Sequence, residues 1–187
     1  LDAKVRKELR RWIRQLHNEI HLTSIFVTHD QEEALEVADR VVIMNKGQIE
    51  QIGTPEEVYD QPANPFVYRF LGNVNLFRGR VSEGKVRIDT GAAEEQEGHL
   101  STIAYARPHE LEIHRVINDD NAAIAAVIVH MRAIGPMVQL ELKRADTGEF
   151  IEAELTKERS RELHLQTGDR VFVELKNLKV FVEDFTI

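Results

Sequence analysis

Residues 23–34 read TSIFVTHDQEEA. Four of the first five, all but Ser24, are β-branched or apolar, and there is no regular polar alternation. This predicts a strand buried on both faces, as in a parallel sheet. Asp30, with Glu33 three positions later, is a capping pair that predicts a helix from Gln31 to about Ala38. Thr28-His29 therefore lies just beyond the carboxyl end of the expected strand, where open α/β sheets bind their ligands.

His29 is the first candidate functional residue. Its imidazole would lie beside the first N–H groups of the expected helix, where it could donate to a phosphate oxygen or polarise an attacking water. On spacing alone, a histidine that only satisfies a loop hydrogen bond is the simpler interpretation. The residues themselves leave both possibilities open.

The segment before His29 predicts a long helix. Apolar residues recur at spacings of three and four, as on one face of a helix; they are Val5, Leu9, Trp12, Ile13, Leu16 and Ile20. Basic residues occupy much of the remaining surface and are interpreted as a solvated face, because the chain as a whole is acidic.

Helix-start signals and a turn organise the residues after Ala38. Residues 40–44 and 48–52 read as two strands joined by a turn. Thr54-Pro55 and Asn64-Pro65 each place a capping residue before a proline at the first helical position. The second helix is expected to end at Gly72. We place a domain boundary there, which gives a first domain of residues 1–72.

From Val74 onward the pattern changes to short strands separated by turn residues, which predicts a small barrel or sandwich over residues 73–187. The expected strands are residues 76–81, 86–88, 103–106, 111–113, 122–133, 137–142, 150–155, 171–175 and 180–185, with a short helix at 157–163 and a polar connection at 92–98.

Composition excludes several classes of function. The formal net charge is -8, from 24 basic and 32 acidic side chains, so nucleic acid is not expected as a partner. Cysteine is absent, which excludes disulfides and thiolate chemistry and favours a reducing, cytoplasmic compartment. The longest wholly apolar run, residues 122–129, is too short to span a membrane, so no direct membrane insertion is expected.

Metal and nucleophile sites are not expected either. The histidines outside the first domain show no paired ligand spacing; they are His99, His109, His114, His130 and His164. The G-x-S-x-G pattern of a serine nucleophile is also missing.

Several stretches of the first domain resemble the final third of an ABC-transporter nucleotide-binding domain. They are Leu1-Asp2, residues 27–34, Ala38-Asp39-Arg40-Val41, Lys46-Gly47, Gly53-Thr54-Pro55, Val58-Tyr59 and Pro62-Ala63. This resemblance implies that Asp2 ends the D-loop, which helps to organise a composite site across a dimer. It also implies that His29 is the switch histidine, which contacts the γ-phosphate and the catalytic water.

The second domain resembles the OB-like β-domain, often called TOBE, that follows the nucleotide-binding domain in importer ATPases. Its usual mark is an Arg-Pro dipeptide after a strand, present here as Arg107-Pro108, and Gly168-Asp169-Arg170-Val171 is a further match. Residues 6–17 and Asn73-Val74-Asn75 most resemble ATP-binding subunits of the sulfate/thiosulfate class. Sugar or polyamine importers are the alternative within the same family.

Arg107 is the second candidate functional residue, because related β-domains sometimes bind a small oxyanion as a regulator. A structural arginine at the end of a strand is the other interpretation. If oxyanion binding were the main activity, the chain would be a non-enzymatic sensing or dimerisation module. This is the alternative to an ATPase subunit.

The resemblance implies an α/β portion of a P-loop domain, with its Walker A half missing, followed by an all-β OB-like barrel. It further implies ATP and Mg²⁺ in the complete subunit, a homodimer of ATPase subunits, and permease subunits that hold it peripherally on the inner face of the cell membrane. The Walker A pattern, G-x-x-x-x-G-K-[ST], occurs nowhere in this sequence. Because phosphoryl transfer depends on the groups that hold the phosphates and Mg²⁺, we expect this chain alone neither to bind ATP tightly nor to hydrolyse it.

Overall fold

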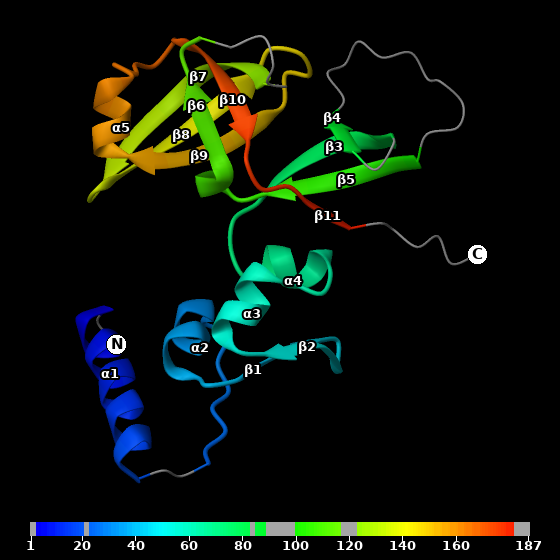
Figure 1. Ribbon diagram of the computed structural model, residues 1–187. Helices are drawn as coiled ribbons and strands as arrows, with labels where there is room; N and C mark the ends of the chain where they lie inside the picture. The colour runs from blue at the N-terminus through cyan, green and yellow to red at the C-terminus, as the bar shows by residue number, and fades with distance from the viewer. Residues whose placement is uncertain (1–2, 21–22, 83–84, 89–99, 117–122, 182–187) are drawn as a thin grey trace. The chain divides into compact units, whose positions relative to one another are not determined.

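The computed structural model describes residues 3–20, 23–82, 85–88, 100–116 and 123–181 (Figure 1). The chain divides into two compact units, an N-terminal unit, Leu1–Gly72, and a C-terminal unit, Asn73–Ile187. None of the described helices is both long and apolar enough to cross a membrane.

The N-terminal unit consists of four helices and one β-hairpin among its described residues (Figure 1). In chain order these are α1 (Ala3–Ile20), α2 (Gln31–Val37), β1 (Val41–Asn45), β2 (Gln48–Gly53), α3 (Pro55–Asp60) and α4 (Pro65–Phe70). The buried core is small and lies between the hairpin and the last two helices; its members are Val41, Ile43, Val58, Val67 and Leu71.

Local signals place the hairpin and both short helices where the sequence predicts them. Lys46 and Gly47 adopt left-handed φ values of 48° and 80°, as a tight turn between antiparallel strands requires. Thr54 caps α3 in a capping box with Glu57. Asn64 caps α4 by accepting from the backbone N–H of Val67 at 3.0 Å.

The expected strand at residues 23–27 is absent, and that prediction is wrong. These residues have no regular structure, and Ile25 and Val27 are 93% and 89% exposed. The only strands described in the N-terminal unit, β1 and β2, pair with each other in antiparallel fashion. A strand needs a neighbour to accept its backbone hydrogen bonds, and the described part of this unit offers none to residues 23–27.

The C-terminal unit is built around a five-stranded antiparallel sheet in the order β6-β10-β7-β8-β9 (Figure 1). Its strands are β6 (Leu111–His114), β7 (Ala123–Ile134), β8 (Met137–Arg144), β9 (Phe150–Thr156) and β10 (Arg170–Leu175). The edge strands β6 and β9 contact each other without forming a ladder. The sheet is therefore curled into a small, partly open barrel, with α5 (Lys157–Glu162) following β9.

A second sheet of four strands packs against this barrel, in the order β11-β5-β3-β4. Its strands are β3 (Asn75–Ser82), β4 (Lys85–Ile88), β5 (Leu100–Ala106) and β11 (Lys179–Phe181), and the short 3-10 helix η1 (Pro108–Glu110) follows β5. Phe77, Ala104 and Ala106 of this sheet share one apolar core with the barrel. The expected β-rich second half is confirmed, while the polar connection at 92–98 and residues 182–185 lie outside the described residues.

Two buried polar side chains fasten the sheets together. The Asn75 amide, on β3, donates to the backbone oxygen of Glu152 at 2.8 Å and accepts from the backbone N–H of Glu152 at 2.7 Å. It thus satisfies the backbone of the edge strand β9 as a neighbouring strand would.

The second fastening side chain is Arg144, at the end of β8. Its guanidinium is 1% exposed, donates to both carboxylate oxygens of Asp146 at 2.7 and 2.9 Å, and lies 5.7 Å from the centre of the Phe77 ring on β3. The hydrogen bonds from Arg144 hold the pKa of Asp146 below its ordinary value. The stabilisation from this pair is therefore complete above the ordinary carboxyl pKa and is lost as the pH falls.

We expect Asn75→Ala to destabilise the C-terminal unit by about 1–2 kcal/mol, because it leaves a backbone donor and acceptor of Glu152 unpaired. Urea unfolding of the whole chain, followed by far-ultraviolet circular dichroism, measures this change. The matched control is Asn73→Ala, because Asn73 is exposed and makes only a 3.4 Å contact with the Glu152 carboxylate. Equal stability of the two variants would contradict the fastening role of Asn75.

Candidate functional site

The loop before α2 is held in a fixed shape by three polar residues around His29. The Thr28 hydroxyl donates to the Glu33 carboxylate at 2.8 Å and accepts from the backbone N–H of Asp30 at 3.0 Å. The Asp30 carboxylate accepts from the backbone N–H of Glu33 at 3.1 Å and so caps α2. We call these three residues, Thr28, Asp30 and Glu33, the clip.

The expected capping pair of Asp30 and Glu33 forms only in part. Asp30 caps the helix as the sequence predicts, but the Glu33 side chain bonds to Thr28 instead of returning to the backbone N–H of Asp30. The Asp30 N–H is taken by the Thr28 hydroxyl. Because the clip satisfies these groups internally, the loop keeps its shape without using the side chain of His29.

His29 lies at the bend of this loop and its side chain is exposed to solvent. Within the part of the chain that the structure describes, its ring has no hydrogen-bond partner. An imidazole exposed in this way can donate to an anion or accept a proton. The hydrogen bonds that the structure describes in this loop are made by the neighbours of His29.

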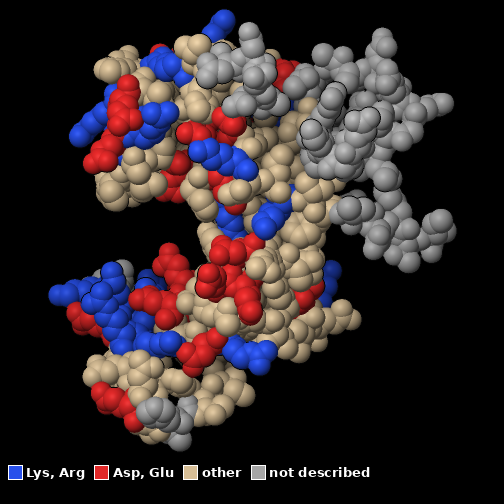
Figure 2. All heavy atoms as spheres, viewed as in Figure 1, with Lys and Arg blue, Asp and Glu red and all other residues tan. Residues whose placement is uncertain are grey.

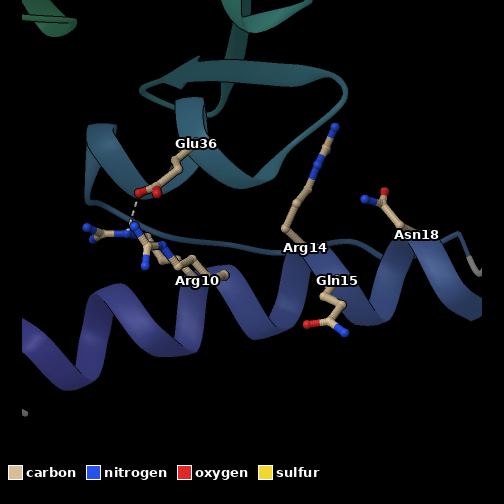
Figure 3. A pocket seen from close by; sticks show the side chains of 6 residues that line it. Arg10, Arg14, Gln15, Asn18 and Glu36 are labelled. Carbon is tan, nitrogen blue, oxygen red and sulfur yellow. Dashed lines mark ion pairs between the residues drawn. The ribbon is translucent and has the colours of Figure 1, made fainter.

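A ladder of ion pairs holds α2, and with it the clip, against α1. Arg10 Nε lies 2.7 Å from the Glu36 carboxylate (Figure 3). An Arg10 Nη lies 4.0 Å from the Glu33 carboxylate. The Glu33 carboxylate thus contacts both Thr28 of the clip and Arg10 of α1. A shift of α1 along this face would therefore be transmitted to the loop that carries His29.

The ladder continues toward the carboxyl end of α2. Arg14 donates to the Asp39 carboxylate at 2.7 Å and to the backbone oxygen of Val37 at 2.9 Å. His17 Nε2 lies 3.6 Å from the same carboxylate of Asp39. Figure 2 shows the resulting juxtaposition of basic and acidic side chains in the N-terminal unit.

Sequence reasoning missed this ladder, because it interpreted the basic residues of the first helix as solvated. The spacing carries the signal: basic residues at positions 10, 14 and 17 lie on one face of α1, and acidic residues at 33, 36 and 39 lie on one face of the following segment. Two charge series of opposite sign at helical spacing predict a contact between the segments.

A cavity of about 290 Å³ adjoins the ladder (Figure 3). Its lining residues are Arg10, Arg11, Arg14, Gln15, Asn18 and Glu36. Arg10 and Arg14 are already paired with Glu36 and Asp39, so most of the positive charge around the cavity is neutralised. We assign no ligand to it.

Apolar side chains are exposed on two parts of the N-terminal unit. On α1, Leu9 and Trp12 are 44% and 58% exposed. In the loop, Ile25, Phe26 and Val27 are all exposed, and they lead directly into the clip. Exposed apolar residues in a run indicate a surface that another structure covers.

The other two candidate residues are Asp2 and Arg107. Asp2 lies outside the described residues. Arg107 is only 3% exposed, inside the C-terminal unit. Its backbone N–H donates to the Glu110 carboxylate at 2.7 Å, and the Glu110 N–H donates to the backbone oxygen of Arg107 at 2.9 Å. Arg107 is thus a buried residue at the start of the η1 turn.

Comparison with protein families matches two segments of the C-terminal unit. Residues 75–113 match the CysA C-terminal regulatory domain, and residues 118–176 match the TOBE-like domain. A crystal structure of the cytoplasmic molybdate-binding protein ModG with molybdate bound is 17% identical, with a TM-score of 0.46, and the match covers 58% of this chain and 95% of that chain.

The whole chain is similar to curated proteins named sulfate/thiosulfate import ATP-binding protein CysA. The protein of Bacillus cereus is 57% identical over 192 residues, which cover 100% of this chain and 54% of the relative. The protein of Nitrosomonas europaea is 59% identical over 187 residues, which cover 97% of this chain and 51% of the relative. The protein of Halalkalibacterium halodurans is 53% identical over 193 residues, which cover 100% of this chain and 54% of the relative. The chain therefore spans about half the length of these relatives.

We expect Thr28→Val to loosen the loop that carries His29, because it removes both hydrogen bonds of the Thr28 hydroxyl. Losing about 1.4 kcal/mol of local stability corresponds to about tenfold faster hydrogen exchange at the Asp30 N–H. Exchange measured by nuclear magnetic resonance on the whole chain tests this, with Thr23→Val, at an exposed position before the clip, as the matched control. If Asp30 exchanges at the same rate in both variants, the clip does not hold the loop.

Proposed function

Over its whole length this chain matches the C-terminal part of the sulfate/thiosulfate import ATP-binding proteins of the ABC-transporter class, and we propose that it is part of the ATP-hydrolysing subunit that powers a sulfate or thiosulfate importer. The relatives quoted above all carry this name, which favours it over a sugar or polyamine importer. The complete subunit would bind ATP and Mg²⁺, and this chain would contribute His29 to the nucleotide site.

The exposed imidazole of His29, held at the bend of a fixed loop, is the observation that carries the proposal. We assign it the role of the switch histidine, which contacts the terminal phosphoryl group of ATP and the attacking water. The clip of Thr28, Asp30 and Glu33 fixes the backbone on both sides of His29. Such preorganisation removes the entropy cost of placing the ring when the nucleotide arrives. Mg²⁺ would neutralise charge on the phosphate oxygens.

The exposed apolar residues of the N-terminal unit support the same proposal. Ile25 and Val27 are almost fully exposed, and burying a side chain of this size stabilises a protein by about 1.5–3 kcal/mol. We propose that the remainder of the subunit covers these residues and α1, which would complete an α/β nucleotide-binding domain of the P-loop type. Residues 23–27 would then gain the strand neighbours that they lack here. By the same resemblance we assign Asp2 to the D-loop at the dimer contact.

We propose that the C-terminal unit is a regulatory β-domain outside the nucleotide site. Its two sheets share one core, so it does not need the N-terminal unit for burial of its apolar residues. Two subunits would form a homodimer and engage the permease subunits at the inner face of the membrane. The alternative of an oxyanion-sensing module depends on Arg107, whose side chain is buried, and this favours the ATPase-subunit proposal.

We expect this chain alone to bind Mg-ATP no more tightly than about millimolar, because one imidazole without a phosphate cradle supplies little of the roughly 8 kcal/mol that micromolar affinity requires. Isothermal titration calorimetry of the whole chain with Mg-ATP measures this affinity. Saturable binding in the micromolar range would show that a second nucleotide-binding surface exists here.

In the complete subunit, His29→Ala should lower kcat for ATP hydrolysis by about 10²–10⁴-fold, as expected for loss of a group that acts on the proton of the attacking water. The KM for ATP should change less than about threefold, because the phosphates are held elsewhere. Steady-state kinetics separate the two effects, and His130→Ala, at an exposed position in the C-terminal unit, is the control. Turnover unchanged by His29→Ala would remove the assignment.

A further inference from the structure

Three metal-ligating side chains converge on the outer face of the β6–β10 pair. Glu112 and His114 are two residues apart on β6, so both project to the same face. Glu174 on β10 lies directly opposite Glu112 in the antiparallel register. One ligand atom from each of the three lies within 4.8 Å of the other two.

The distances fit a single metal ion. His114 Nε2 lies 3.0 Å from the Glu174 carboxylate and 3.8 Å from the Glu112 carboxylate. Around a tetrahedral Zn²⁺ with bonds of about 2.0–2.2 Å, ligand atoms are about 3.3–3.6 Å apart. The observed separations lie on either side of this value, so small side-chain movements would bring all three into coordination.

The chemistry of the donors selects the kind of cation. One imidazole nitrogen with two carboxylate oxygens is a ligand set that Zn²⁺ and neighbouring transition metals accept. Ca²⁺ and Mg²⁺ prefer oxygen ligands alone. Three protein ligands would leave a fourth position for water.

The environment of the same ring nitrogen also favours a cation. The Nε2 atom of His114 is shielded from solvent, and among the described residues its 3.0 Å approach to the Glu174 carboxylate is not a hydrogen bond. An unsatisfied buried polar atom costs free energy, as do two like charges placed directly opposite each other on neighbouring strands. A cation between the three side chains would relieve both costs.

Lys176 supplies part of this positive charge, because its ammonium group pairs with the Glu112 carboxylate. An entering cation would have to displace Lys176 from Glu112, so Lys176 is a built-in competitor.

We propose that Glu112, His114 and Glu174 bind one divalent cation of the Zn²⁺ class, which links β6 to β10 on the outer face of the barrel. This inference does not depend on the proposed ATPase function. Sequence analysis predicted no metal site because Glu174 is far from the other two ligands in the chain. Only the strand register shows that the three meet.

Calorimetric titration of the untagged chain with zinc chloride tests the site. We expect saturable binding with one ion per chain, and His114→Gln should weaken it at least about tenfold. The matched control is His130→Gln, because His130 also faces a glutamate, Glu141, at 3.8 Å on the neighbouring strand but without a third ligand. This control should bind zinc within about twofold of the unchanged chain.

Lys176→Gln distinguishes a built site from adventitious zinc binding. Removing the competing ammonium should strengthen binding by up to about fivefold, which corresponds to the loss of one exposed ion pair of about 1 kcal/mol. Zinc should also shift the ¹⁵N resonance of His114 Nε2 in the unchanged chain, a readout that needs no variant to fold. The proposal is overturned by absent or unsaturable zinc binding, by equal affinity of the His114→Gln and His130→Gln variants, by weaker binding in Lys176→Gln, or by an unmoved His114 resonance.

Discussion

The N-terminal unit presents more apolar surface than its own elements can bury. Its core is confined to the hairpin and the two helices that follow, while the apolar residues of α1 and of the loop before α2 remain exposed. What joins α1 to α2 is mainly charge, through the pairs of Arg10 with Glu36 and of Arg14 with Asp39. Because ion pairs open to solvent stabilise a structure only weakly, α1 and the loop before α2 would gain most from the covering surface that we propose.

The C-terminal unit buries a larger apolar core within its own elements. Both of its sheets contribute to a single apolar core, and Asn75 and Arg144 use buried hydrogen bonds where apolar packing alone would leave backbone or charge unsatisfied. Such fully partnered polar groups favour one arrangement of the two sheets over others. This difference between the units agrees with the regulatory role that we propose for the C-terminal unit.

Local signals were sufficient for the elements that depend on local interactions. The caps at Thr54 and Asn64 and most strands of the C-terminal unit follow from turn residues and alternation. The prediction of a strand at residues 23–27 was wrong because a buried strand requires neighbouring strands, and local sequence does not encode them. The meeting of Glu174 with His114 was hidden by the same limit, because only strand register shows it. The partners of Arg10 and Arg14 were missed for a different reason, since the spacing of the two charge series does carry that signal.

The candidate histidine lies in the unit that is least able to bury its own apolar surface, and this location has a physical consequence. His29 is held by its clip, and the clip is tied to α1 through the carboxylate of Glu33. Under the proposed function, a surface that covers the apolar face of α1 would also act on the loop that carries the imidazole. A nucleotide site completed in this way would have its reactive histidine placed by assembly of the whole domain. Covering the apolar face of α1 would then both stabilise the N-terminal unit and position His29 for its chemistry.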